Sequence, residues 1–402
     1  MTSTADQMRA WRGPALLSFG FRPFFLGAAL WAVLAMLLWS LMLAGELTLP
    51  SAFDPVSWHA HAFLFGYVPA VVAGFLLTAV PNWTGRLPIV GWPLGALFGL
   101  WIAGRLVVMF SANTDPFVVA LFDLAMPLGL AGMIGREIVV GKNWRNLIVL
   151  AMLLALIFGN AVFHWEAARG DFAARGYGFR IGLGATLMMI AVIGGRVVPS
   201  FTRNWLVKQG ADRLPAPPMQ RFDKAALLFL LLALLLWVAM PADVHVTALA
   251  LCVAGALHMG RLIRWAGLST LSEPLVVVLH VAYAFVPIGA VALGLELLVP
   301  ALSGLGAVQH LWMGGAIGLM TLAVMTRATL GHTGRDLSAG SGTVLIYTGV
   351  IGATLLRVSA AIWPSAAMTL YTASAALWML SFAGFAAIYG PLLLRAKHAK
   401  AI

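Results

Sequence analysis

The sequence predicts an all-α protein, a polytopic membrane bundle of about twelve transmembrane helices. Two observations carry this prediction. Of the 402 residues, 61% are hydrophobic and only 10% are charged, whereas soluble domains have about 25% charged residues. The apolar residues also form separate stretches, and a membrane-spanning helix needs roughly 20 of them in a row. Together these features exclude a soluble enzyme or binding module.

Each apolar stretch between short connections rich in Gly, Pro and Asp is interpreted as one span. The N-terminal segment lacks the short apolar core and cleavage site of a signal peptide. The longest connection, 200–222, is predicted to be a cytoplasmic loop, and residues 1–402 are predicted to form a single transmembrane domain. In chain order the predicted spans are 22–44, 57–80, 92–110, 117–140, 145–165, 179–199, 223–241, 244–265, 272–299, 307–330, 342–363 and 366–393.

The distribution of basic residues predicts the topology. Of the 25 Lys and Arg residues, 20 fall in the termini and in alternate connections, so the positive-inside rule places the N- and C-termini in the cytoplasm. A net charge of +11 therefore does not indicate nucleic acid, because the charges form no surface tract. The single cysteine, Cys252, excludes an intrachain disulfide and a four-cysteine cluster.

A weak internal repeat links the second and tenth spans. Residues 61–86 and 310–335 align without a gap and share six identities, among them His61 with His310 and a terminal Thr-Gly-Arg. Residues 197–205, at the end of the sixth span, echo the same ending. We hypothesise three arcs of four helices around a pseudo-threefold axis. The alternative is a chance likeness between apolar helices.

Histidines are the main functional signal. Ionisable groups are costly in a bilayer and usually functional there, and histidine is the commonest metal ligand. At about 1.5 Å rise per residue, four of them fall in an outer layer, two lie together in the inner half and one lies at the cytoplasmic rim. In that order they are His59, His61, His164 and His310, then His258 and His280, then His332.

Two kinds of metal site follow from these depths. His258 and His280 lie at one depth on consecutive antiparallel spans and are candidate ligands of a haem iron or a shared metal. The outer histidines and His332 are candidate metal ligands. His59 and His61 point about 200° apart on a helix, and the repeat favours His61 and His310. No CxxCH motif is present, so any haem is bound non-covalently.

Two arginines lie inside spans, Arg105 and Arg357, and both are candidates to pair with haem propionates. The alternative is pairing with Asp123, with Glu296 or with backbone carbonyls. Asp123, Glu166 and Glu296 are candidate proton-transfer groups near the outer side. A proton relay in a transporter and purely structural hydrogen bonding are the competing interpretations of the whole set.

Three long segments resemble the NnrS family: FGFRPFFLGAALWA (19–32), WHAHAFLFGYVPAVVAGFLLTAVPNWTGR (58–86) and LWMGGAIGLMTLAVMTRATLGHTGR (311–335). The resemblance implies a bacterial inner-membrane protein of the nitric oxide response, found with denitrification or nitrosative-stress genes and containing haem and copper. Many relatives have a glutamate where this chain has Ala62. Twelve spans in three arcs also resemble the haem–copper oxidases, by fold-level analogy alone.

The expected function is therefore a membrane haem b protein, with copper as a second metal, that binds nitric oxide. Its expected activity as an oxidoreductase is reduction of nitric oxide to nitrous oxide, with electrons from a membrane quinol or a redox partner. Two alternatives stay open. The chain could be a transporter or a metal- or haem-trafficking protein that acts indirectly, or a nitric oxide sensor without turnover.

Overall fold

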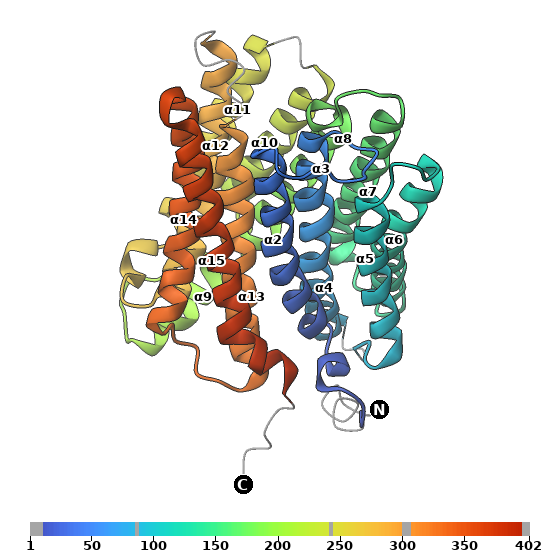
Figure 1. Cartoon of the computed structure of the whole chain (residues 1–402). Coiled ribbons are helices and arrows are strands. Elements are labelled where there is room, and N and C mark those ends of the chain that lie inside the picture. The colour runs from blue at the N-terminus through green and yellow to red at the C-terminus, as the bar shows by residue number, and fades with distance from the viewer. Residues whose placement is uncertain (1–10, 85–87, 241–243, 300–306, 396–402) are drawn as a thin grey trace. The chain divides into compact units, whose positions relative to one another are not determined.

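The computed structural model describes residues 11–84, 88–240, 244–299 and 307–395 (Figure 1). Within these ranges every regular element is helical, and 12 helices are long and apolar enough to cross a membrane. The predicted polytopic all-α fold is thus confirmed. The Gly85-Arg86 end of the repeat and the basic residues Arg9, Lys397 and Lys400 lie outside the described residues.

The observed spans agree with the predicted ones to within a few residues, except the sixth. They are Phe21–Leu43, Pro55–Pro81, Trp92–Met109, Pro116–Val140, Trp144–Ala168, Tyr177–Lys208, Arg221–Ala239, Val244–Ile263, Pro274–Leu298, Leu311–Thr333, Ser341–Ile362 and Pro364–Leu394.

The predicted loop 200–222 is too long. Helix α9 (Gly195–Lys208) continues past Pro199, and the non-helical connection to α10 (Arg221–Ala239) covers only residues 209–220. The hydroxyls of Ser200 and Thr202 bond carbonyls one turn back, at Arg196 and Val198. The prediction ended the helix where polar residues begin, but a polar segment can stay helical beyond the apolar core.

The described chain divides into two compact units. Unit 1 comprises the residues up to 183, residues 328–336 and the residues from 382 onward, and unit 2 comprises 184–327 and 337–381. Three helices therefore contribute to both units: α8 (Tyr177–Met189), α13 (Leu319–Thr333) and α15 (Ala367–Leu394). The predicted single transmembrane domain stays a prediction.

Unit 1 is built mainly from the first five spans. Helix α2 packs against α4, α5 against α6, and α6 against α7. Arg22 of α2 closes the C-terminal end of α15 by donating from Nη1 to the carbonyls of Leu393 (2.9 Å) and Arg395 (2.7 Å). Its elements are η1 (Ala15–Ser18), α2 (Phe21–Leu43), α3 (Pro55–His61), η2 (Ala62–Tyr67), α4 (Val68–Thr84), α5 (Trp92–Met109), α6 (Pro116–Val140), η3 (Trp144–Asn146), α7 (Leu147–Ala168) and η4 (Ala173–Arg175).

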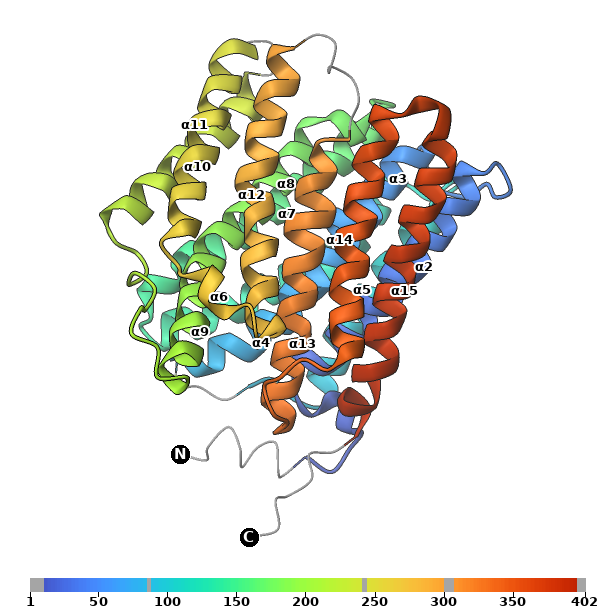
Figure 2. The same cartoon turned by 90° about the vertical axis from the view of Figure 1, so that its left-hand side faces the viewer.

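Unit 2 is organised around α11 and α12, which lie side by side (Figure 2). A Cβ at Gly255 of α11 would come within 2.9 Å of the Pro287 carbonyl oxygen. A small residue is therefore needed for this close approach, as is common between membrane helices. The remaining elements of this unit are η5 (Ile190–Gly194), α9, α10, α11 (Val244–Ile263), η6 (Gly267–Thr270), α12 (Pro274–Leu298), η8 (Leu311–Gly318), α14 (Ser341–Ile362) and η9 (Pro364–Ala366).

Within the described residues three spans contain a π-helical segment, which is a rare feature often found at functional sites. One begins directly after His61 (η2) and another directly after His310 (η8). These two starts coincide in the gap-free alignment of the repeat, so the likeness of the second and tenth spans extends to an unusual backbone conformation. The third, η5, does not start at the corresponding position of the sixth span. The three-arc arrangement stays a hypothesis.

Candidate metal centre

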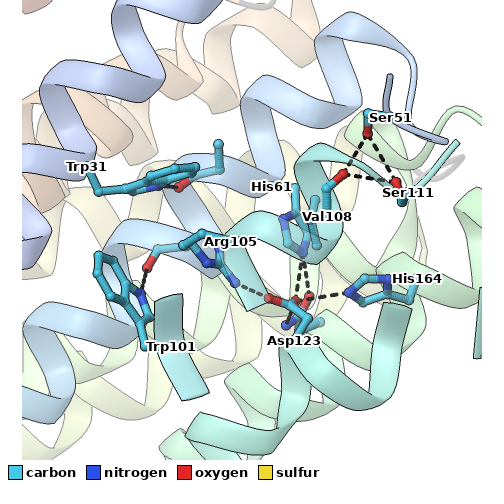
Figure 3. A network of polar contacts seen from close by, with 12 residues as sticks. Trp31, Ser51, His61, Trp101, Arg105, Val108, Ser111, Asp123 and His164 are labelled. Carbon is cyan, nitrogen blue, oxygen red and sulfur yellow. Dashed lines mark hydrogen bonds and ion pairs between the residues drawn. The ribbon is translucent and has the colours of Figure 1, made fainter. Parts of the chain in front are cut away.

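A buried carboxylate, Asp123, is the centre of a polar network in unit 1 (Figure 3). It lies two turns into α6 and is 3% exposed. Its Oδ1 accepts a hydrogen bond from Arg105 Nη2. Its Oδ2 is 3.0 Å from His61 Nε2, 3.0 Å from His164 Nε2 and 2.8 Å from Asn160 Nδ2. Side chains from α3, α5, α6 and α7 thus meet at one carboxylate.

Three of these side chains could hold a metal ion together. One ligand atom from each of His61, Asp123 and His164 lies within 4.8 Å of the others, and all three residues are buried. In the described part of the chain this is the one group of three or more such residues with that spacing. Two imidazoles and a carboxylate form a donor set typical of copper, iron and zinc sites.

The backbone around His61 is held by indoles. His61 is the last residue of α3, whose start is capped by Asp54, and the π-helical segment η2 follows it. Trp31 Nε1 donates to the Ala62 carbonyl at 2.8 Å, and Trp101 Nε1 donates to the Gly66 carbonyl at 2.9 Å. Both contacts satisfy carbonyls in the wide turn that follows His61, and Figure 3 shows the two indoles near Arg105.

Two glycines make room for the Arg105–Asp123 pair. A Cβ at Gly66 would collide with Arg105 Nη1, and a Cβ at Gly104 would lie 3.1 Å from both Cα and Oδ1 of Asp123. The guanidinium carbon of Arg105 also lies 5.9 Å from the centroid of the Trp31 ring. The ion pair is therefore enclosed by backbone and aromatic surface.

Hydrogen-bond geometry assigns the proton of His61. Its Nε2 faces two acceptors, Asp123 Oδ2 and Asn160 Oδ1 at 3.1 Å, so this nitrogen carries the hydrogen. In a neutral ring the lone pair is then on Nδ1, which is buried and has no hydrogen-bond partner among the described residues. Metal-binding histidines usually donate one ring N–H to a carboxylate, which orients the ring and leaves the other nitrogen available.

Aromatic rings surround His61 in this network. The ring centroids of Phe53, Phe65 and Phe163 lie 5.1, 5.5 and 5.5 Å from that of His61. The His61 and His164 rings are 5.1 Å apart and nearly perpendicular. In such surroundings charge interactions are stronger than in water, and an unpaired charge is correspondingly costly. The Arg105 charge offsets the Asp123 charge, so both are present without a net charge.

Two other acidic candidates are also buried, in different surroundings. The carboxylate of Glu166 accepts hydrogen bonds from the backbone N–H groups of Tyr177 (2.6 Å) and Gly178 (3.1 Å). It thereby caps the N-terminus of α8, where a negative charge is favourable. Glu296, near the C-terminal end of α12, is 8% exposed. The proton-transfer role predicted for these residues stays a prediction.

His258 and His280, both in unit 2, have separate partners. His258 Nδ1 lies 2.8 Å from the Tyr283 hydroxyl, and its Nε2 lies 3.1 Å from the Ala226 carbonyl oxygen. His280 Nε2 lies 2.8 Å from the Thr202 hydroxyl. Both ring nitrogens of His258 are therefore engaged. Ligation of a haem iron by His258 and His280 stays a prediction. In their observed positions, the two residues do not both have a nitrogen free of hydrogen bonds.

The remaining predicted residues lie elsewhere in their units. In unit 1, His59 stacks on Trp39 with ring centroids 4.4 Å apart, and His332 contacts the rings of Phe19 and Phe21. In unit 2, His310 directly precedes η8. Arg357, also in unit 2, has its guanidinium carbon 4.7 Å from the centroid of the Tyr371 ring.

Sequence reasoning grouped His61 with His164 by depth but overlooked Asn160. Its signal was present, because Asn160 lies one helical turn before His164, and residues at i and i+4 share a helix face. It also named Asp123 only as a proton carrier and as one possible partner of Arg105. The pairing with Arg105 is found, and the central position of Asp123 is the part that was missed.

The family comparison agrees with this picture of a membrane protein. The family model described as NnrS protein matches residues 15–397. No curated protein matches the chain.

Proposed function

This chain belongs to the NnrS family of membrane proteins of the nitric oxide response, and we propose that His61, Asp123 and His164 hold a metal ion that binds nitric oxide. The observation that carries the proposal is the convergence of three buried ligand atoms within 4.8 Å. Such a group is costly inside a membrane protein, and residues of this kind are usually functional.

The residues fit a transition metal better than Mg²⁺ or Ca²⁺. Imidazole nitrogens suit copper, iron and zinc, whereas the alkaline-earth ions prefer an all-oxygen set. His164 would bind the ion after Nε2 gives up its hydrogen bond to Asp123, and His61 would bind either in the same way or through its buried Nδ1. We propose copper as the first candidate, with iron second. When bound, such an ion would supply a coordination position for nitric oxide and a change of oxidation state.

The protein side chains have three tasks in this proposal. Before an ion binds, Asp123 orients the two imidazoles through its Oδ2, and Arg105 fixes Asp123 through its Oδ1. The phenylalanine rings around His61 exclude water from the group. Nitric oxide is small, apolar and soluble in lipid, so it reaches a dry site without a polar channel.

Haem fits the histidines of unit 2 less well. His258 would have to give up a hydrogen bond, to Tyr283 or to the Ala226 carbonyl, before either nitrogen could bind iron. His280 has one nitrogen on Thr202, and its Nδ1 faces Gly267, where a Cβ would lie 2.6 Å away. The proposal therefore assigns no role to haem at these two histidines. A Soret band that is lost in His280→Ala would support haem b at this place.

Metal analysis of the purified full-length protein tests the proposal. We expect copper or iron in proportion to protein, a changed optical or paramagnetic resonance spectrum on adding nitric oxide, and loss of both in His61→Gln and His164→Gln. The matched control is His245→Gln, since His245 is an exposed histidine at the start of α11. Wild-type protein without metal after copper and iron loading, or full metal content in both variants, would refute the site.

Reduction of nitric oxide is the catalytic form of the same proposal. Two molecules of nitric oxide, two electrons and two protons give one nitrous oxide and one water. The electrons would come from a membrane quinol or a redox partner. Nitrous oxide formed by the reduced, purified protein supports an enzyme, whereas metal-dependent binding without nitrous oxide identifies a sensor. Protein that carries no metal and forms no nitrous oxide would favour a transporter or trafficking role.

The proposed location is the bacterial inner membrane, with both chain termini in the cytoplasm. The predominance of Lys and Arg in the termini and in alternate connections supports this orientation, as does the even number of spans. The connection 209–220 then lies on the cytoplasmic side, and residues 110–115 lie on the opposite side.

A further inference from the structure

A second buried polar network lies in unit 2 and includes none of His61, Asp123 and His164. Its centre is Tyr283 of α12, which is 0% exposed. The Tyr283 hydroxyl is 2.8 Å from His258 Nδ1 and 2.8 Å from Arg261 Nη1. Arg261 is itself fixed by Asp223, with Nε 2.8 Å from Oδ1, and by the Ala191 carbonyl at 2.8 Å.

The direction of each hydrogen bond follows from its partners. The Ala226 carbonyl only accepts, so His258 Nε2 carries the hydrogen, and in a neutral ring Nδ1 has the lone pair. Arg261 only donates, so it occupies a lone pair of the Tyr283 oxygen. The Tyr283 O–H therefore donates to His258 Nδ1. A phenol is thus held against an imidazole that can take its proton over a single hydrogen bond.

The chain of hydrogen bonds ends inside the protein. Beyond His258 the next group is the Ala226 carbonyl oxygen, which has no proton to pass on. The arrangement is therefore unsuited to carrying protons across the membrane. It suits a local shift of one proton, from the phenol to the imidazole and back.

An aromatic contact leads from Tyr283 toward the end of α11. The Trp265 ring centroid lies 4.5 Å from that of Tyr283. Trp265 lies two residues beyond the end of α11, in the turn before η6, so it lies toward one end of the helix pair rather than at its middle. Two easily oxidised rings in contact form a short path for an electron, and the proton acceptor is placed at the inner one.

We propose that Tyr283 and His258 form a redox-active pair in which Tyr283 gives one electron to a one-electron oxidant while its phenol proton moves to His258. The O–H bond of Tyr283 breaks and an N–H bond forms at His258 Nδ1. The products are a neutral tyrosyl radical, an imidazolium and the oxidant reduced by one electron. Return of one electron and the proton restores the pair. The charge of Arg261 is offset by Asp223 throughout.

The test uses the full-length protein in lipid nanodiscs, oxidised with hexachloroiridate(IV) and freeze-quenched for electron paramagnetic resonance. The background carries Tyr177→Phe, because Tyr177 is 50% exposed and would be oxidised directly. We expect a tyrosyl radical in this parent, and its loss in Tyr283→Phe. The matched control is Tyr347→Phe. Tyr347 is also buried in unit 2, but its hydroxyl is bonded to Thr326, so the signal should persist.

A second variant separates proton acceptance from packing. In His258→Gln the side chain still accepts a hydrogen bond from Tyr283 but does not take the proton. Radical formation should slow roughly 100-fold, the lower range for loss of a positioned base. The parent should also react more slowly in deuterium oxide, and this isotope effect should disappear in the variant. A parent without a tyrosyl radical, an undiminished signal in Tyr283→Phe, or an unchanged rate in His258→Gln would each overturn the proposal.

Discussion

Replacing Asp123 with Asn should destabilise the protein by about 3–5 kcal/mol, the cost of removing one partner from a buried ion pair. Arg105 is 5% exposed and Asp123 is 3% exposed, so water does not compensate the remaining Arg105 charge. The replacement has almost the same shape as Asp123. It therefore removes the charge while the packing of α6 stays intact.

The hydrogen bonds add to this cost. Four side chains donate to the two oxygens of Asp123, whereas an asparagine has one accepting oxygen and an amide that only donates. At least one donor among the neighbours must then face another donor. The variant should also lose the bound metal, because Asp123 is one of the three proposed ligands.

The measurement is equilibrium unfolding in mixed micelles, followed by the fluorescence of the 15 tryptophans. A double-mutant cycle with Arg105→Met isolates the pair. The loss in free energy of unfolding of the double variant should be smaller than the sum of the two single losses by about 0.5–3 kcal/mol, because neither charge is then left unpaired.

The control for this prediction is Asp115→Asn at the exposed start of the same helix. Asp115 caps α6 by accepting from Phe117 N and Val118 N, and Asn is an equally good cap. Its effect should stay within about 0.5 kcal/mol. An Asp123→Asn variant as stable as wild type, or strictly additive effects of Asp123→Asn and Arg105→Met, would refute the assigned ion pair.

Three further predictions follow from the same structure. Gly66→Ala should displace Arg105 and lower the free energy of unfolding by about 1–3 kcal/mol. The control Gly99→Ala, with nothing within 4 Å of its added Cβ, should raise that free energy by up to about 1 kcal/mol. Equal unfolding midpoints for the two variants would contradict the close contact at Gly66. Glu166→Ala should cost about 0.5–2 kcal/mol through loss of the α8 cap and leave metal content unchanged; loss of metal with unchanged stability would instead indicate a role at the metal site. In a Cys252→Ala background, an impermeant maleimide applied to spheroplasts should label Asn113→Cys before permeabilisation and Asp212→Cys only after it; the reverse pattern would invert the proposed topology.

The fold was largely determined by local sequence. A stretch of about 20 apolar residues has few options in a bilayer, because every backbone polar group must be satisfied within the segment itself. That constraint acts within one helix, so eleven of the predicted spans match the observed ones closely. It fails at Ser200 and Thr202, where the helix continues into polar sequence and the apolar pattern no longer marks its end.

The candidate site depended on tertiary structure. Composition and depth identified His61, His164 and Asp123 as costly residues, since each cost is a property of one side chain and its position. Which of them meet is decided by how α3, α5, α6 and α7 are rotated about their axes and packed. No local pattern encodes that rotation, so the sequence left Asp123 with several possible partners, and only the packed helices bring Arg105, Asn160 and both imidazoles to its two oxygens.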